Sequence, residues 1–148
     1  MRKFVLQLAS LAVIALAVPA LAETDGWEKG SAYNKNFDAK STVTIAGKIS
    51  KIDRDNHPMP GMGPGLAAVI KTDKGEDVTI QVGPIWFTSY FKHKWDVKVG
   101  DSVQVTGSKV TIGGKPVIMV MKGQKDKLAM AVRNKTGKPV WDLEVEDF

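Results

Sequence analysis

The regular alternation of apolar and polar residues from Ser41 onward constrains the fold of this chain more than any other feature. Alternation with a period of two is typical of β-strands that bury only one face. It predicts five strands separated by turns rich in glycine, proline and aspartate, at residues 43–49, 66–72, 76–82, 103–112 and 117–121. A chain with this pattern is expected to form an all-β domain.

Residues 85–95 interrupt the alternation and change to helical spacing. Phe87, Phe91 and Trp95 are each four residues apart, which predicts a short helix that buries these rings. Trp86 and Tyr90 lie beside them and are expected to share this burial. Three strands, a helix and two more strands follow the order of the OB-fold, in which the helix closes one end of a five-stranded Greek-key barrel.

Two further segments with apolar residues follow the fifth strand, at residues 127–133 and 139–143, and they predict an additional hairpin around residues 134–138. The expected fold is therefore a five-stranded OB-fold-like barrel with one short helix between strands three and four and an extra C-terminal hairpin. On the fifth strand both faces are apolar, so one must fill the barrel and the other must be covered by the N-terminal arm or the C-terminal hairpin. Val117, Met119 and Met121 share one face, opposite Ile118 and Val120.

The first 22 residues have the pattern of a secretory signal peptide. Arg2 and Lys3 precede an apolar run over residues 4–18, and Ala20-Leu21-Ala22 matches a signal-peptidase site. The run is shorter than the roughly 20 residues that a spanning helix needs. We therefore expect cleavage before Glu23, a mature chain without a transmembrane anchor, and a periplasmic or secreted location.

This pattern divides the chain into a signal peptide (residues 1–22), an extended N-terminal arm (residues 23–40) held to the domain by its aromatic residues, and the barrel (residues 41–148). The chain has no cysteine, which excludes disulfides and thiol chemistry. Removing Arg2 and Lys3 with the signal lowers the net charge from +5 to +3. Most of the excess is lysine, which indicates mild attraction to anions rather than a dedicated nucleic-acid surface.

The most distinctive local sequence is His57-Pro58-Met59-Pro60-Gly61-Met62, within a loop predicted for residues 53–65. Imidazole and thioether ligands suit Cu(I), so His57, Met59 and Met62 are candidate metal ligands. The alternative is that both methionines pack over the barrel mouth while His57 is solvated. Without a metal, the loop and the adjoining barrel face predict a ligand-binding groove formed by Asp53, Arg54, His57, Met59 and Met62.

Other classes of function find little support in the sequence. OB-folds that bind oligonucleotides place aromatic and basic residues on the outer face of strands two and three. Here the outward residues of the third strand are Asp77, Thr79 and Gln81, which argues against nucleic acid. Zinc-type histidine spacing and the G-x-S-x-G elbow are both missing, so we expect no enzymatic activity and no obligatory cofactor.

Several short motifs resemble one known family. They are F-D-x-x-S-x-V-x-x-x-G at residues 37–47, K-T-D-K-G at 71–75, V-G-P-x-W at 82–86, V-G-D-x-V-x-V-T-G-S at 99–108, G-K-P at 114–116 and G-K-P-V-W at 137–141. In this order they resemble the small exported bacterial OB-fold proteins of the BOF-like family, which are often described as OB-fold or DNA-binding proteins. The resemblance implies the same barrel and no shared catalytic residues.

These observations predict a non-catalytic, exported OB-fold protein that binds a partner in the cell envelope. The partner could be a small molecule, an envelope glycan or a protein, and the sequence leaves its identity and the oligomeric state open. One alternative is a periplasmic chaperone or sensor for Cu(I) or Ag(I), with copper bound by His57, Met59 and Met62. A second alternative is an oligonucleotide-binding protein.

Overall fold

The structure, a computed structural model, describes residues 25–91 and 96–142. The predicted signal peptide (residues 1–22) lies outside the described residues, as do Trp95 and Leu143. Within the described ranges, no helix is both long enough and apolar enough to cross a membrane.

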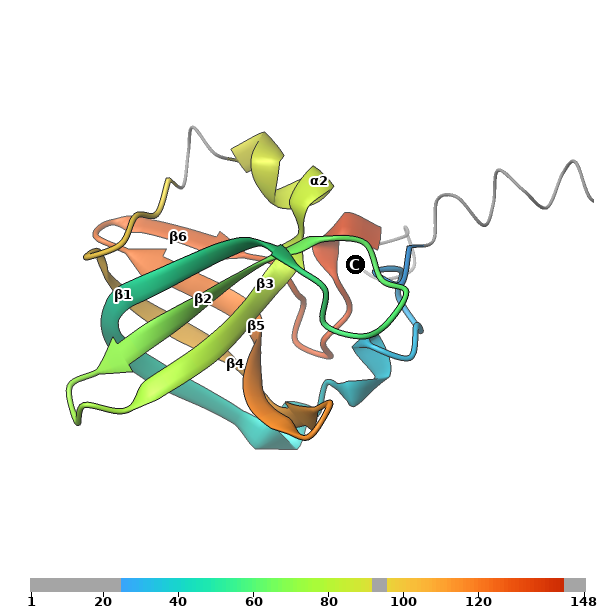
Figure 1. The fold of residues 1–148 in the computed structure, drawn as a ribbon, viewed down its shortest axis with the longest axis horizontal. Coiled ribbons are helices and arrows are strands. Elements are labelled where there is room, and N and C mark those ends of the chain that lie inside the picture. The colour runs from blue at the N-terminus through green and yellow to red at the C-terminus, as the bar shows by residue number, and fades with distance from the viewer. Residues whose placement is uncertain (1–24, 92–95, 143–148) are drawn as a thin grey trace, which may run out of the picture.

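The described part of the chain contains six strands: β1 (Thr42–Asn56), β2 (Gly65–Thr72), β3 (Asp77–Pro84), β4 (Ser102–Ile112), β5 (Lys115–Lys125) and β6 (Leu128–Ala131). They form one sheet in the order β3-β2-β1-β4-β5-β6, and a parallel pairing between β3 and β5 closes it into a ring. Figure 1 shows the strands curling around a common interior, with α2 (Ile85–Thr88) at one end. The predicted OB-fold-like barrel is confirmed, and β6 extends it beside β5.

The long strand β1 belongs to both halves of the barrel. Its residues 42–48 pair with β4, and its residues from 47 onward pair with β2. The two pairings overlap at Gly47 and Lys48, and a side chain at Gly47 would clash with the backbone carbonyl of Lys71. Glycine lets the two backbones approach this closely, and the approach allows β1 to turn from one partner strand to the other.

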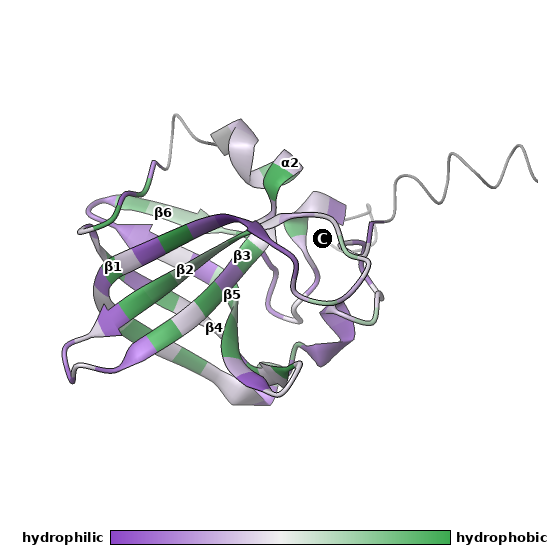
Figure 2. Cartoon of the chain, viewed as in Figure 1, coloured by the Kyte–Doolittle hydropathy of each residue, from purple (hydrophilic) through white to green (hydrophobic). Residues whose placement is uncertain are grey.

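Two apolar cores lie on opposite sides of the barrel wall. Alternation along β1 and β3 is visible in Figure 2, and it directs one set of side chains inward. On β5, Ile118 and Val120 belong to the inner core, while Val117 and Met119 belong to an outer core. The prediction that both faces of this strand are covered is therefore confirmed, and Met119 is completely buried.

The outer core is covered by the segment before β1. This segment is not the extended arm that the sequence predicts, because residues 25–41 form turns and two short 3-10 helices, η1 (Asn34–Asn36) and η2 (Ala39–Ser41). Trp27 and Tyr33 are each only 1% exposed, and their rings meet edge to face with centroids 5.1 Å apart. Two buried aromatic side chains make this segment part of the folded domain rather than a loose terminus.

The aromatic helix is shorter and more exposed than predicted. The α-helix ends after one turn at Thr88 and is followed by a 3-10 turn, η3 (Ser89–Phe91). Phe87 packs against the inner core, but Trp86 is 48% exposed and Tyr90 is 80% exposed. The expected burial of these two rings is wrong, because Trp86 and Tyr90 lie four residues apart on the side of the turn that faces away from the barrel.

The predicted C-terminal hairpin is reduced to a single bridge between Arg133 and Pro139. Residues 128–131 pair with β5 instead, and residues 140–142 form the 3-10 turn η4 (Val140–Asp142). The turn at residues 134–138 is present, because the Asn134 side chain accepts hydrogen bonds from the Thr136 and Lys138 backbone. Val132 lies in the inner core and Trp141 packs against both cores, whereas Leu128 is 53% exposed.

Trp27 offers a direct test of whether the N-terminal segment belongs to the cooperative fold. Replacing it with alanine should lower the free energy of unfolding by about 3–5 kcal/mol, as for other large buried side chains. Urea denaturation followed by circular dichroism measures this loss. Tyr90→Ala, which removes an exposed ring, is the control and should change stability by no more than about 0.5 kcal/mol. Equal stability of both variants would contradict the packing described here.

Candidate functional site: the loop between β1 and β2

The loop between β1 and β2 is shorter than the sequence predicts. Strand β1 continues to Asn56, so Asp53 and Arg54 lie in the strand rather than in the loop. The prediction of a loop from residue 53 is wrong because Asp53 still pairs with Ala67 of β2, and Arg54 lies in an irregularity of the register between Asp53 and Asn56. Arg54 is exposed, and an Asp53 carboxylate oxygen accepts a hydrogen bond from the Asp55 backbone N–H at 2.9 Å.

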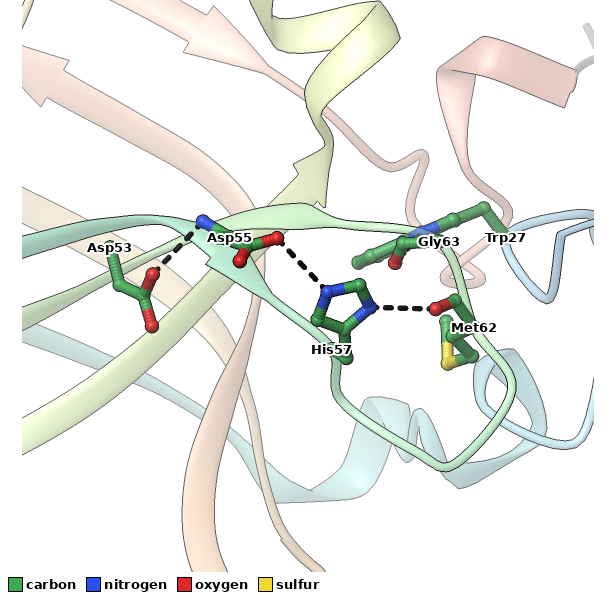
Figure 3. A network of polar contacts seen from close by, with 6 residues as sticks. All are labelled: Trp27, Asp53, Asp55, His57, Met62 and Gly63. Carbon is green, nitrogen blue, oxygen red and sulfur yellow. Dashed lines mark hydrogen bonds and ion pairs between the residues drawn. The ribbon is translucent and has the colours of Figure 1, made fainter.

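His57 is held at both ring nitrogens (Figure 3). Its Nδ1 lies 2.7 Å from the carbonyl oxygen of Met62, and its Nε2 lies 3.0 Å from Oδ1 of Asp55. Both partners are acceptors, so only the protonated ring can donate to both at once. The bond to the Met62 carbonyl, and then the bond to Asp55, raise the pKa of His57 above its usual value.

The two methionines of the loop point toward the outer core. Met62 is 8% exposed and belongs to that core, and Met59 packs against it. Their packing agrees with the non-metal alternative, in which thioether side chains fill irregular apolar space. The hydrogen bonds of His57 to Met62 and Asp55 hold the polar side of the same loop.

Further hydrogen bonds fix the loop to the N-terminal segment and to α2. The indole N–H of Trp27 donates to the Gly63 carbonyl at 3.0 Å, and the Gly63 N–H donates to the Asp25 carbonyl at 2.9 Å. The Ile85 N–H donates to the Pro64 carbonyl at 3.0 Å. The loop is therefore bound to two other segments, and its conformation is determined before any ligand arrives.

The prediction that His57, Met59 and Met62 bind Cu(I) stays a prediction, to which the structure adds a requirement. A metal at His57 needs one ring nitrogen to leave either the Met62 carbonyl or Asp55. A metal at Met62 needs a buried thioether to turn out of the outer core. Among the described residues, no group of three or more histidine, aspartate or glutamate side chains could hold a metal.

Chemically, the fixed loop and the end of β1 present polar groups of both signs. Arg54, Asp55 and His57 are exposed, while Met59 and Met62 pack on the outer core. Such a surface can form hydrogen bonds and ion pairs with a polar partner. His57 contacts a carboxylate and a carbonyl, neither of which is the hydroxyl or thiol that a histidine activates in nucleophilic catalysis.

Sequence reasoning missed the importance of Arg133. This side chain is 2% exposed, and its guanidinium lies over the rings of Phe37 and Trp141, 5.6 Å and 5.3 Å from their centroids. Its Nη1 donates to Asn34 Oδ1 at 2.8 Å and to the Gly137 carbonyl at 3.0 Å. The one available signal is that only two arginines remain after the signal peptide, and this one precedes an Asn-Lys-Thr-Gly turn.

The N-terminal segment that Arg133 contacts also covers part of the outer face of β2 and β3, which OB-folds use to bind ligands. Gln81 points to this outer face but is only 6% exposed, and its side chain accepts a hydrogen bond from the Tyr33 hydroxyl at 2.8 Å. Burial raises the pKa of Tyr33 to about 12, although the charge of Arg133 opposes this rise. The hydroxyl therefore remains a donor to Gln81 at any physiological pH.

A family model described as the MamS/MamX magnetosome protein family matches residues 41–130, which is more than half of the chain. The chain belongs to this family. The matched region covers all of β1 to β5 and most of β6. The resemblance to the BOF-like family is therefore corrected at the level of the family, while its OB-fold part is confirmed.

Comparisons with curated proteins and with solved structures give no further information about function. No curated protein matches the chain. Among solved structures, it is similar to the N-terminal domain of the PriB protein from Thermoanaerobacter tencongensis, at 13% identity and a TM-score of 0.45, over 58% of this chain and 96% of that chain. The fold assignment rests on the strand order and register given above.

The paired ring of His57 makes the loop sensitive to pH. Because the pKa of His57 is raised in the folded protein, its stabilising contribution is complete below about 6.5, the unfolded value, and is lost as the pH rises through the folded value. An NMR titration of the His57 ring should therefore show a pKa above 6.5.

Asp55→Asn should lower the pKa of His57 toward its ordinary value, because the charged partner of Nε2 is removed. His93→Gln assigns the resonances, since the chain has only two histidines. If the pKa of His57 were the same in the wild-type protein and in Asp55→Asn, the pairing with Asp55 would be contradicted.

Proposed function

We propose that this chain is an exported, non-catalytic binding protein that serves the magnetosome. Three observations support the proposal: the MamS/MamX family match, the signal-peptide pattern of residues 1–22, and a loop with a preformed conformation at a position that OB-folds use for binding. Its partner is a small molecule, an envelope glycan or a protein of that compartment.

The preformed loop is the observation that carries the proposal. A loop that is ordered before binding loses little conformational entropy when its partner arrives. Hydrogen bonds from Trp27, Gly63 and Ile85 provide this order without using the exposed side chains of the neighbouring strand end. Arg54 is thus available for contact with a polar partner, while Asp55 pairs with His57.

Oligonucleotide binding is less well supported. The end of the outer face around Gln81 is covered by Tyr33, and the open part of the same face carries the ion pair between Lys71 and Asp77, at 3.9 Å. Stacking platforms for bases need exposed aromatic side chains beside basic ones on this face. The exposed rings of Trp86 and Tyr90 belong to α2 and η3 instead.

Fractionation of a magnetosome-forming bacterium that carries the epitope-tagged chain tests the proposal. The tagged protein should be enriched with isolated magnetosomes, and its intact mass should correspond to a mature chain that begins at Glu23. Arg54→Glu should lose most of this enrichment if the strand end and loop form the binding surface. Lys48→Glu is the matched control, because it makes the same change of charge at an exposed position earlier on the same strand.

Two results would contradict the proposal. An uncleaved chain that remains in the cytoplasm would refute export. Equal enrichment of both variants, with unchanged unfolding curves, would refute binding through Arg54 and the adjacent loop.

A further inference from the structure

The strand register leaves one end of the barrel open. Strands β3 and β5 pair only at Ile80 with Ile118 and at Gln81 with Met119. Strand β1 pairs with β2 only from Gly47 onward, so its first residues separate from the β2–β3 hairpin. The start of β1 and the start of β3 therefore flank a gap in the hydrogen-bonded wall. The turn between β2 and β3 lies away from α2 in Figure 1, so α2 does not cover this end.

A cavity of about 370 Å³ occupies this open end. Its volume falls within the range of roughly 300–1,000 Å³ that is typical of small-molecule sites. Its lining includes four branched aliphatic side chains from three strands, Val43, Ile45, Val78 and Ile118, and polar residues at its rim. None of the residues from 53 to 65 lines it, so it is separate from the β1–β2 loop.

The floor of the cavity is the exposed end of the inner core. Ile118 is 1% exposed and belongs to that core, while Val43, Ile45 and Val78 are partly buried and pack against it. An apolar group in the cavity would therefore complete the burial of three side chains that the protein leaves half covered. Burial of apolar surface favours binding in proportion to the area removed from water.

The charge at the rim is unevenly distributed. Asp73, Lys74 and Glu76 all lie in or beside the β2–β3 turn, so their charges partly compensate one another. Lys109 comes from β4 on the other side and is paired in register with Ile118, directly beside the floor. Within residues 25–91 and 96–142, Lys109 makes no ion pair. It is the basic group best placed to meet an anion above the apolar floor.

We propose that the open end of the barrel binds a small amphipathic anion. Its aliphatic or aromatic body would lie on Val43, Ile45 and Val78, and its carboxylate or sulfonate would pair with the Lys109 ammonium. The inference deepens the proposed function, because it names a ligand class and a second site for a binding protein, and it rests on that function. A cationic or strongly hydrophilic ligand does not fit this combination of floor and rim.

Decanoate is a suitable probe, since it combines an aliphatic chain with one carboxylate. The experiment titrates decanoate into the mature protein labelled at its valine and isoleucine methyl groups and follows the methyl NMR spectrum. Saturable shifts should be largest at Val43, Ile45, Val78 and Ile118. 1-Decanol, which has the same body without charge, should bind more weakly to the wild-type protein.

Lys109→Glu should weaken the affinity for decanoate at least about tenfold, equivalent to about 1.4 kcal/mol. Lys127→Glu is the matched control, because it changes the charge equally in the exposed turn between β5 and β6 and should leave the affinity unchanged. In Lys109→Glu the preference for decanoate over decanol should disappear, an effect that a general loss of stability would not produce.

Three results would overturn the inference: methyl shifts centred on Ile85, next to the exposed ring of Trp86, equal affinity of the two variants, or the absence of saturable binding. Each leaves the proposed function standing if the chain still accompanies magnetosomes. Conversely, decanoate binding at Lys109 by a chain that fails the fractionation test would preserve this site and refute the magnetosome role.

Discussion

The buried guanidinium of Arg133 joins the two ends of the described chain. It contacts Asn34 and Phe37 before β1, and Gly137 and Trp141 after β6. A buried charge is costly, and burial accordingly lowers the pKa of this arginine. Its Nε and Nη2 have no hydrogen-bond partner among the described residues. Two aromatic rings and the two hydrogen bonds that Nη1 donates offset part of that cost. Removing the side chain would delete the contacts through which Arg133 joins two segments about a hundred residues apart in the sequence, and it would leave the hydrogen bond between Trp141 and Trp27 to hold them together.

This connection determines where the protein can bind a partner. The N-terminal segment covers Gln81 and Met119, and Trp141 donates a hydrogen bond to the Trp27 carbonyl at 2.7 Å. Part of the outer face that OB-folds use for ligands is therefore occupied by the chain itself. The two binding sites that we propose, the fixed loop after β1 and the open end beside Lys109, both lie outside this covered part.

The sequence predicts the barrel well, because strand patterns depend on neighbouring residues. The alternation on the fifth strand correctly separates Ile118 from Met119, since successive side chains point to opposite faces. The sequence pattern fails where the length of an element decides which side chains are buried, because the spacing of apolar residues does not give that length. A helix that stops after one turn cannot bury both Phe87 and Tyr90, although their sequence spacing is helical.

The site is less predictable than the fold. The loop composition draws attention to His57 and Met62, but their contacts with Asp55 and Trp27 cannot be predicted from spacing. The open end of the barrel has no motif at all, because it results from the register between strands. Arg133 escaped notice for a similar reason, since its burial requires segments from both ends of the chain to meet.

Native-state hydrogen exchange tests the central claim, which is that the terminal segments close the outer face as part of one cooperative domain. The amides of Phe37, Gly63 and Val140 donate to backbone carbonyls within these segments or between them and the barrel. They should exchange with the same opening free energy as the amides that join β1 to β4. Faster exchange at these three sites alone would mean that the segments open while the barrel stays folded. That result would contradict the claim, because the outer face around Gln81 would then be open to ligands.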